Sequence, residues 1–412
     1  MSRKFATLKS FSVISFGNIT SRIISAFISI LLARQLGPSV FGNYSILFAV
    51  MTTIGLGFSG LDITYVHSAI KFKNIKFSNY FSTKILLFLI IVIPITLFSK
   101  LIINNYFRNI SLIGFFIALI ASFFFASYTT IYAYFQRHEL YRKYAIVQVS
   151  YYFIVLIIIL LGLTLFSKNI PYYYYLISYI IASILIFIVF IIKRKGIELK
   201  IDPDVISFFK FGKWIILSEL SLVLFARLDL IILSHFITGA SLGYYSAAIK
   251  IVNIYLVFTA AFSVIMLPKA SKVKNKAEQK KFYKSGFLLV ALLIMIAVVI
   301  MLSSKFVVIL FYGKEYIPAF KYVILLLLAY LPFTLYQPFR YISYTFNNTR
   351  LLFIITLIQN IILISLGWYS IKMFGINGII YIKGFAYLVA LIIFVYMSYK
   401  MGKNFKYESN SL

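Results

Sequence analysis

The chain has no cysteine and only 10 acidic residues in a length of 412. The absence of cysteine excludes disulfides, thiolate metal sites and a cysteine nucleophile. Its three histidines, His67, His138 and His235, lie too far apart in the sequence to suggest a zinc motif. Long polar stretches are also missing, so the chain has no room for a soluble domain of ordinary size. These absences argue against metal and thiol catalysis.

Hydrophobic residues make up 62% of the chain and charged residues only 12%. The hydrophobic residues gather in segments of about 20 residues, the length that crosses a bilayer as a helix. The first segment is longer than the core of a signal peptide, so we expect it to be retained as a helix. The expected spans lie near residues 11–33, 40–66, 81–103, 110–135, 144–166, 172–192, 208–235, 242–267, 285–311, 317–346, 351–373 and 376–399.

The net charge of +30 comes from 40 Lys and Arg residues. These residues lie mainly in alternate short loops, which is the pattern that the positive-inside rule requires of a membrane protein. Nucleic acid is therefore not an expected partner, although a high positive charge alone would suggest it. The same pattern predicts that both termini are cytoplasmic.

An internal match divides the chain into two halves. The segment LARQLGPSVFGNYS from Leu32 aligns without gaps with LSHFITGASLGYYS from Leu233, and both copies occupy the outer turn between the first two helices of a half. Halves with the same orientation are typical of transporters built from parallel repeats. We therefore expect an all-α integral membrane protein with about twelve transmembrane helices in two six-helix lobes. The expected lobes are residues 1–192 and 208–412, joined by a basic cytoplasmic linker, 193–207.

The first span carries a polar face with a cation at its centre. Ser15, Asn18, Arg22, Ser25 and Ser29 are spaced three or four residues apart, which places them on one side of a helix. Arg22 lies about 18–20 Å from either end of the span, near the bilayer midplane. A charge at that depth is costly unless it serves a cavity or a partner, so Arg22 is the strongest candidate for substrate binding. The alternative is a structural hydrogen bond to backbone or to an acidic neighbour.

Four further cations lie within expected spans: Arg227, Lys250, Arg340 and Lys383. Arg227 and Lys250 are both expected about 12 Å below the outer surface. Arginine offers planar, bidentate contacts to phosphate oxygens and lysine adds a point charge, so the five cations together predict an anionic ligand such as a diphosphate. The alternative for Arg340 and Lys383 is a bond within their own lobe.

Two acids also lie deep within the expected spans, Glu219 and Asp229. They suggest either ion pairs within a lobe or sites for a coupling proton or sodium ion. Uncharged polar residues are candidates for lining a cavity and bonding sugar hydroxyls, although hydrogen bonds between helices are an equally good interpretation of each. They are Asn18, Ser25, Asn253, Gln337, Gln359 and Asn360. No metal site, catalytic residue or cofactor is expected.

Six segments in a fixed order carry a family resemblance. They are LLARQLGPSVFGNYS, GLDITYVHSAIK, RLDLIILSHF running into LGYYSAAIK, MLPKASK, LFYGKEYIPAF and FGINGIIY. Over nearly the whole chain they resemble the polysaccharide-repeat (Wzx-type) flippases of the multidrug/oligosaccharidyl-lipid/polysaccharide (MOP) exporter superfamily. The resemblance implies a MATE-like fold with two six-helix lobes around a central cavity. It also implies export of undecaprenyl-diphosphate-linked sugar units, as used for O-antigen, capsule or exopolysaccharide, from the inner to the outer leaflet of a bacterial cytoplasmic membrane.

The expected mechanism is alternating access without catalysis, with a lipid-diphosphate-linked oligosaccharide as substrate. A proton or sodium counter-ion and a polysaccharide polymerase or export machinery are further candidate partners. A small-molecule or drug exporter of the same superfamily is the nearest rival, but organic cations call for acidic cavity groups. A membrane glycan polymerase would need catalytic carboxylates near a sizeable loop, and the sequence shows no such loop.

Overall fold

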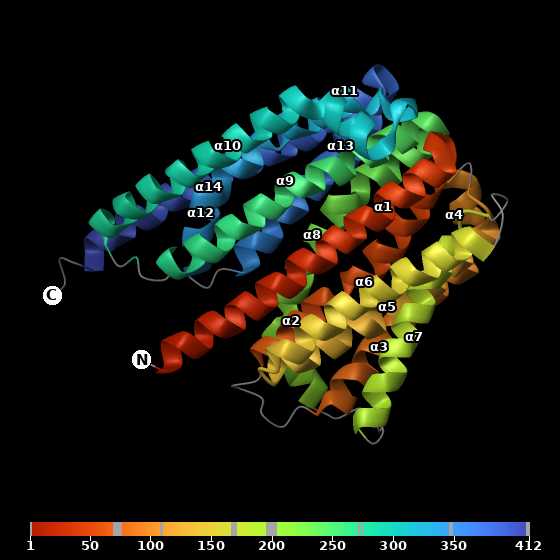
Figure 1. The fold of residues 1–412 in the computed structure, drawn as a ribbon. Helices are drawn as coiled ribbons and strands as arrows, with labels where there is room; N and C mark the ends of the chain where they lie inside the picture. Colours follow the sequence, from red (N-terminus) through yellow and green to blue (C-terminus); the bar gives the residue numbers. More distant parts are fainter. Residues whose placement is uncertain are drawn as a thin grey trace. The chain divides into compact units, whose positions relative to one another are not determined.

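The computed structural model describes residues 2–68, 76–107, 110–165, 171–194, 204–270, 273, 275–345 and 349–408. Within these ranges the chain forms helices and no strand (Figure 1). The helices are α1 (Ser2–Gly57), α2 (Ser59–His67), α3 (Phe77–Leu97), α4 (Ser99–Tyr106), α5 (Leu112–Arg137), α6 (Tyr141–Leu165), α7 (Tyr174–Arg194), α8 (Asp204–Phe236), α9 (Ala240–Ala270), α10 (Lys276–Tyr312), η1 (Lys314–Tyr316), α11 (Ala319–Ala329), α12 (Leu331–Thr345), α13 (Thr349–Phe374) and α14 (Ile376–Glu408).

Ten candidate spans among the described residues are long and apolar enough to cross a membrane. One of them, Val13–His67, contains two crossings, because Gly37 breaks α1 with φ 68° and ψ 168°. Helix α8, with 33 residues, is also long enough to cross, although it is too rich in charged residues to count among the ten. With these two additions the structure agrees with the prediction of about twelve transmembrane helices.

Two predicted spans are divided by breaks near prolines. The span expected at 81–103 consists of α3 and α4, which part at Phe98, four residues after Pro94. The span expected at 317–346 consists of α11 and α12, which part at Tyr330, two residues before Pro332. Proline has no backbone N–H and its ring crowds the preceding turn, which explains the break just before Pro332. The Tyr330 N–H still donates to the Leu326 carbonyl at 2.9 Å, which keeps the second break tight.

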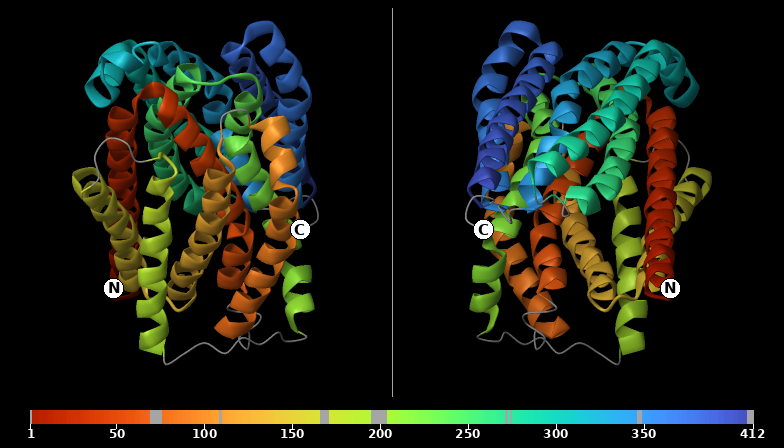
Figure 2. Two further views of the ribbon diagram at one scale, coloured as in Figure 1. Left: turned by 90° about the vertical axis from the view of Figure 1, so that its right-hand side faces the viewer. Right: turned by 90° about the vertical axis from the view of Figure 1, so that its left-hand side faces the viewer.

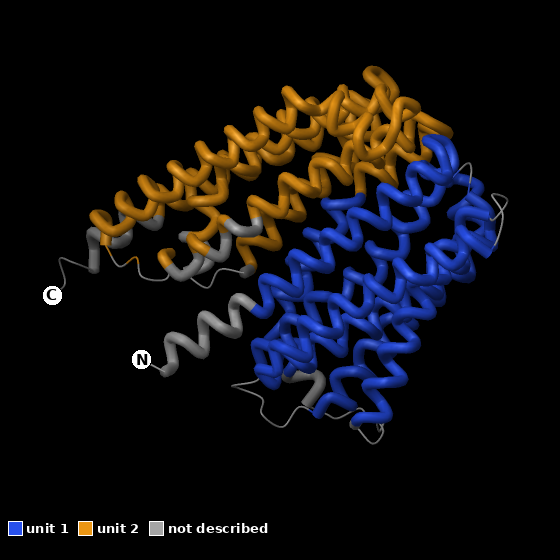
Figure 3. Tube along the Cα trace, viewed as in Figure 1, with its two compact units in different colours: residues 1–227 blue, residues 228–412 orange. Residues whose placement is uncertain are grey.

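The chain divides into two compact units, Met1–Arg227 (unit 1) and Leu228–Leu412 (unit 2) (Figure 3). The long helices of each unit lie side by side (Figure 2). In unit 1, α1 packs against α5 and α6, and α5 packs against α7; in unit 2, α14 packs against α11, α12 and α13. The first part of α8 belongs to unit 1, where it packs against α2. The linker expected at 193–207 lies largely outside the described residues, and the lobe boundaries 1–192 and 208–412 stay a prediction.

The two copies of the internal match have the same burial. All four identical pairs are buried in both units: Leu32 and Leu233, Gly42 and Gly243, Tyr44 and Tyr245, Ser45 and Ser246. The turns differ by one residue, because the left-handed glycines are Gly37, with φ 68°, and Gly239, with φ 69°. The ungapped alignment instead pairs Gly37 with Thr238, so the correspondence of the repeats shifts by one position inside the turn.

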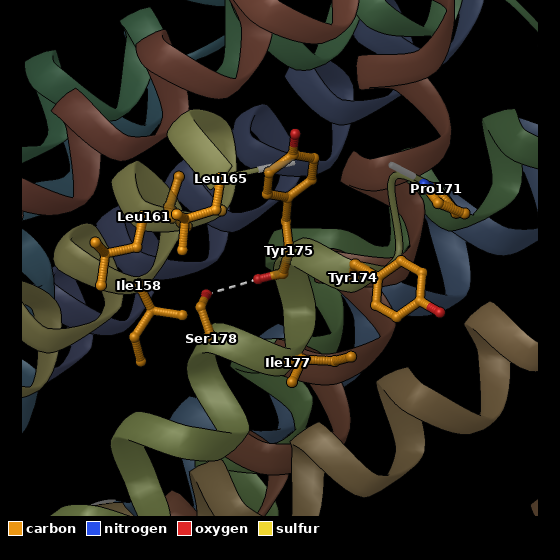
Figure 4. A pocket seen from close by; sticks show the side chains of 10 residues that line it. Ile158, Leu161, Leu165, Pro171, Tyr174, Tyr175, Ile177 and Ser178 are labelled. Atoms are coloured by element: carbon orange, nitrogen blue, oxygen red, sulfur yellow. Dashed lines mark hydrogen bonds between the residues drawn. The ribbon is translucent and has the colours of Figure 1, made fainter. Parts of the chain in front are cut away.

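Helices α2 and α8 approach so closely in unit 1 that glycine is required between them. A Cβ at Gly60 would lie 2.5 Å from the Cα of Ile216 and 3.1 Å from its carbonyl oxygen. A Cβ at Gly162 of α6 would meet no atom within 4 Å. Gly162 lines a cavity of about 550 Å³ between α6 and α7 (Figure 4).

We expect Gly60→Ala to destabilise the protein by about 1–3 kcal/mol through overpacking. Gly162→Ala is the matched control, because it changes the same residue type inside a helix without a clash. It should be neutral or stabilising by up to about 1 kcal/mol, since alanine has the higher helix propensity. Denaturant unfolding of the purified variants in detergent measures both effects. Equal stability of the two variants would contradict the close approach of α2 and α8.

Candidate functional site

The cation on the polar face of α1, Arg22, is an exposed residue of unit 1. Arg22 is exposed, Asn18 and Ser25 are half-buried, and Ser29 is buried. Next to this face, α1 packs closely on α6, because an added Cβ at Gly17 would lie only 2.7 Å from the Cβ of Ala145. The exposure of the side chains therefore varies along this polar face, and Arg22 is the most exposed of them.

Two of the predicted cations belong to unit 1. Arg22 of α1 is exposed and Arg227 of α8 is half-buried. Within the described part of the chain, Arg22 makes no ion pair with a carboxylate. Its positive charge is therefore available to an anion, which favours the binding interpretation over the structural one.

The two cations expected on α9 and α12 lie at different heights in unit 2. Tyr255 of α9 bonds to Thr334 of α12 at 2.5 Å, and the rings of Phe262 and Tyr341 lie 5.8 Å apart. Both contacts fix the same parallel register. Lys250 is five residues before Tyr255, whereas Arg340 is six residues after Thr334. The two side chains therefore start about 16 Å apart along the helix axes, and both are half-buried.

The remaining predicted cation, Lys383, is engaged by Asp229. Its ammonium group donates to Asp229 Oδ2 at 2.5 Å, and the two residues are 1% and 0% exposed. The Tyr245 hydroxyl donates to the same oxygen at 2.5 Å, and the Leu230 N–H donates to Oδ1 at 2.9 Å. Two interpretations were offered for Asp229, and this geometry supports the ion pair within one lobe. Because the charge of Lys383 is balanced inside unit 2, we do not include it among the cations proposed below for substrate binding.

The other polar candidates are distributed over both units. Glu219 of α8 is half-buried in unit 1, and Asn253 of α9 is half-buried in unit 2. Gln337 is 2% exposed. Gln359 Nε2 donates to the Ala386 carbonyl on α14 at 3.4 Å, and Asn360 Nδ2 donates to the Thr356 carbonyl on its own helix at 3.0 Å. The bonds of Gln359 and Asn360 are structural hydrogen bonds, which were the alternative to sugar binding for these residues.

The sequence interpretation missed a buried ion pair in unit 1. Neither Lys84 nor Asp62 is among the charged residues that the sequence analysis expects deep in the membrane. In the structure they are 2% and 4% exposed, and Lys84 Nζ donates to Asp62 Oδ1 at 2.5 Å. The same ammonium donates to the hydroxyls of Thr129 and Thr130 at 2.8 and 3.2 Å. The available signal was position, because both charged residues fall inside predicted spans, 40–66 and 81–103.

Among the described residues, those that line the cavity between α6 and α7 are all uncharged. Figure 4 shows its walls, which include Ile158, Leu161, Leu165 and Ile177. The hydroxyl of Ser178 is already used, since it donates to the Tyr175 carbonyl at 2.6 Å. An apolar cavity of this kind suits a hydrocarbon chain rather than a phosphate, so it is separate from the cationic groups.

Comparison with known proteins assigns the family. The sequence profile described as "Polysaccharide biosynthesis protein" matches residues 31–321. The chain belongs to this polysaccharide biosynthesis family. No curated protein sequence matches it.

Solved structures show the fold. A lipid II flippase, MurJ, in an inward closed conformation is 18% identical with a TM-score of 0.74, over 95% of this chain and 90% of that one. An outward-facing MATE multidrug transporter of the MOP superfamily is 16% identical with a TM-score of 0.64, over 97% and 96% of the two chains. The eukaryotic MATE transporter AtDTX14 is 15% identical with a TM-score of 0.61, over 97% and 99%.

The comparisons confirm the resemblance to the MOP exporter superfamily and the MATE-like fold. These structural relatives are a flippase and transporters. Together with the candidate spans, they make this family member a multi-pass membrane protein.

Proposed function

We propose that this protein is a flippase that moves a lipid-linked saccharide with a diphosphate group from the cytoplasmic to the outer leaflet of the cytoplasmic membrane. Its substrate class is an undecaprenyl-diphosphate-linked repeat unit for O-antigen, capsule or exopolysaccharide. The family description and the flippase among the solved relatives support a lipid-linked substrate. In this proposal the termini lie in the cytoplasm, as the distribution of Lys and Arg predicts.

The observation that carries the proposal is the exposed guanidinium of Arg22, which forms no ion pair with a carboxylate among the described residues. Arg227 of α8 is the second guanidinium of unit 1 that we propose to bind the ligand. Each offers a planar set of donors that matches phosphate oxygens. In unit 2, Lys250 and Arg340 are the cations proposed to bind a phosphate group.

The membrane potential favours the proposed direction. Moving one negative charge outward across an inside-negative potential of about 100 mV releases roughly 2.3 kcal/mol, so a diphosphate with two charges releases about twice that amount. The potential therefore helps to drive an alternating-access cycle in which the polyprenyl tail stays in lipid and the saccharide passes through the protein.

A drug exporter is the second candidate, because the solved relatives include multidrug transporters. An organic cation would need an acidic group facing it. Of the acids whose burial the structure describes, Asp62 and Asp229 are the most deeply buried, and both are bonded to lysines, so neither offers a free negative charge of that kind. The flippase is therefore favoured.

The test is the leaflet distribution of a polyprenyl-diphosphate-linked oligosaccharide in vesicles containing the purified protein. A membrane-impermeant reagent modifies only the glycans that face outward. We expect the protein to accelerate the exposure of glycans from the inner leaflet, and the Arg22→Ala/Arg227→Ala double variant to act like protein-free vesicles. An unchanged distribution with folded wild-type protein would overturn the proposal.

A further inference from the structure

Helix α10 of unit 2 has one exposed side, and the chemistry of this side changes along the helix. The opposite side is buried at helical spacing, through Gln279, Phe282, Gly286, Val290, Leu293, Ala297, Ser304 and Val308. The first turns of the exposed side carry four lysines, which we call the lysine face: Lys276, Lys280, Lys281 and Lys284. The exposed residues that follow, up to Leu302, are all apolar: Phe287, Leu288, Ala291, Leu292, Met295, Val298, Val299 and Leu302.

The apolar part of this side has the length of a bilayer core. The next charged residue of α10 after Lys284 is Lys305, which is also exposed. The two lie 21 positions apart, or about 31 Å along the helix, and the hydrocarbon core of a membrane is about 30 Å thick. Lys284 therefore lies at the boundary between hydrocarbon and headgroups, and the rest of the lysine face lies on the headgroup side.

Helix α14 marks the same boundary. The hydroxyl of Tyr283 is hydrogen-bonded to the hydroxyl of Ser398 on α14, so the start of α10 and the end of α14 lie at the same end of unit 2 (Figure 1). Tyr396 and Tyr399, on either side of Ser398 in the sequence, are exposed. Exposed tyrosines are typical of the interface between membrane and water. They place Lys284 at the headgroup level independently of the length of α10.

The lysine face has positive charge to offer an external anion. None of its four lysines forms an ion pair with a described residue. Glu278, in the first turn of α10, is half-buried, and Lys280 is only two residues away, so the two side chains point in different directions. Lys280 and Lys284 are four residues apart and therefore neighbours on the helix surface, where like charges repel. An anion shared between the two ammonium groups removes this repulsion.

We propose that the lysine face binds the headgroup phosphate of an acidic phospholipid, whose acyl chains lie along the apolar side of α10 from Leu288 to Val299. Lysines next to a transmembrane helix attract anionic headgroups, and the exposed apolar side chains contact hydrocarbon. One molecule thus matches both parts of the exposed side. In the predicted orientation this lipid belongs to the cytoplasmic leaflet. The proposal does not depend on the flippase function.

A soluble polyanion, such as a nucleic acid or an acidic protein, fits this side less well. Leu288 is 74% exposed and lies one turn beyond Lys284. The bilayer that covers Leu288 brings its own headgroups to Lys284, so a soluble partner would have to displace them. It would also leave the apolar part of the side without a contact.

The proposed lipid-linked substrate carries the same phosphate chemistry, but its saccharide needs polar groups along its path. The exposed residues of α10 from Phe287 to Leu302 are apolar and offer no side-chain hydrogen bond to a sugar. This side of the helix therefore suits a resident phospholipid better than a molecule in transit.

The test is photolabelling of the full-length protein in phosphatidylcholine vesicles that contain a minor share of phosphatidylglycerol. Either lipid carries the same photoreactive acyl chain, and mass spectrometry measures the labelling of residues 285–302. Each lysine near an anionic headgroup contributes roughly fivefold in affinity. We therefore expect phosphatidylglycerol to label this segment preferentially, and the preference to fall by about tenfold to a hundredfold in Lys276→Gln/Lys280→Gln/Lys284→Gln.

The matched control is Lys305→Gln/Lys314→Gln/Lys321→Gln, which removes the same charge from exposed lysines elsewhere in unit 2 and should keep the preference. In the wild type, about 1 M salt should reduce the preference, because it screens charges beyond about 3 Å. Equal labelling by the two lipids, or a preference that survives in the first triple variant, would overturn the proposal. Displacement of the label by unlabelled polyprenyl diphosphate or soluble polyglutamate, but not by unlabelled phosphatidylglycerol, would assign the lysine face to the substrate or to a soluble partner instead.

Discussion

Replacing Arg22 by alanine is expected to slow outward translocation of the lipid-linked saccharide by about tenfold to a hundredfold. A hydrogen bond to a charged group contributes about 1.5–3 kcal/mol, and Arg22 is exposed without a carboxylate partner in the described chain. Its loss therefore removes binding energy for the phosphate without leaving an unpaired acid behind. The measurement is the initial rate of glycan exposure in vesicles with matched amounts of protein.

Two controls separate charge at this site from charge in general. Arg22→Lys should retain part of the rate, since lysine supplies the charge but not the bidentate geometry. Arg142→Ala removes an exposed guanidinium from the first turn of α6, in the same unit, and should keep the wild-type rate. A wild-type rate for Arg22→Ala would exclude Arg22 from the substrate site.

Replacing Lys383 by methionine is expected to destabilise the protein by about 3–5 kcal/mol, the usual cost of removing one partner from a buried ion pair. Asp229 is 0% exposed and would keep only its bonds from Tyr245 and Leu230. The free energy of unfolding in detergent, measured by denaturant titration, reports this loss.

The double variant Asp229→Asn/Lys383→Met should recover most of the lost stability, because it removes both charges and leaves no unpaired ion. Lys372→Met changes the same residue type at an exposed position in the last turn of α13 and should stay within about 0.5 kcal/mol of the wild type. If Lys383→Met were as stable as Lys372→Met, the ion pair would contribute nothing to folding.

Hydropathy was sufficient for the class and for most helices. Apolar length predicts spans directly, and Gly37 followed by Pro38 marks the turn at which α1 reverses. The helix breaks at Phe98 and Tyr330 were harder to predict, because a proline in a long apolar segment is compatible with a kink, a break or an uninterrupted helix.

The charged residues show where prediction from the sequence ends. Arg22 was identified because its neighbours at helical spacing are polar, which is a local property. The pairing of Lys84 with Asp62 depends on which helices are neighbours, and hydropathy contains no such information. Lys84 also lies near one end of its predicted span, where a lysine ordinarily reaches toward water and needs no explanation. The same limit applies to Lys383 and Asp229, which are far apart in the sequence but share a hydrogen bond.

The parallel register of α9 and α12 has a consequence for the route of the ligand. The bond between Tyr255 and Thr334 and the contact between Phe262 and Tyr341 hold Lys250 and Arg340 at a separation of about 16 Å along the helices. A diphosphate is much shorter than this distance. If both cations bind the proposed ligand, an anion meets them one after the other, and its passage is divided into two shorter steps instead of one long one.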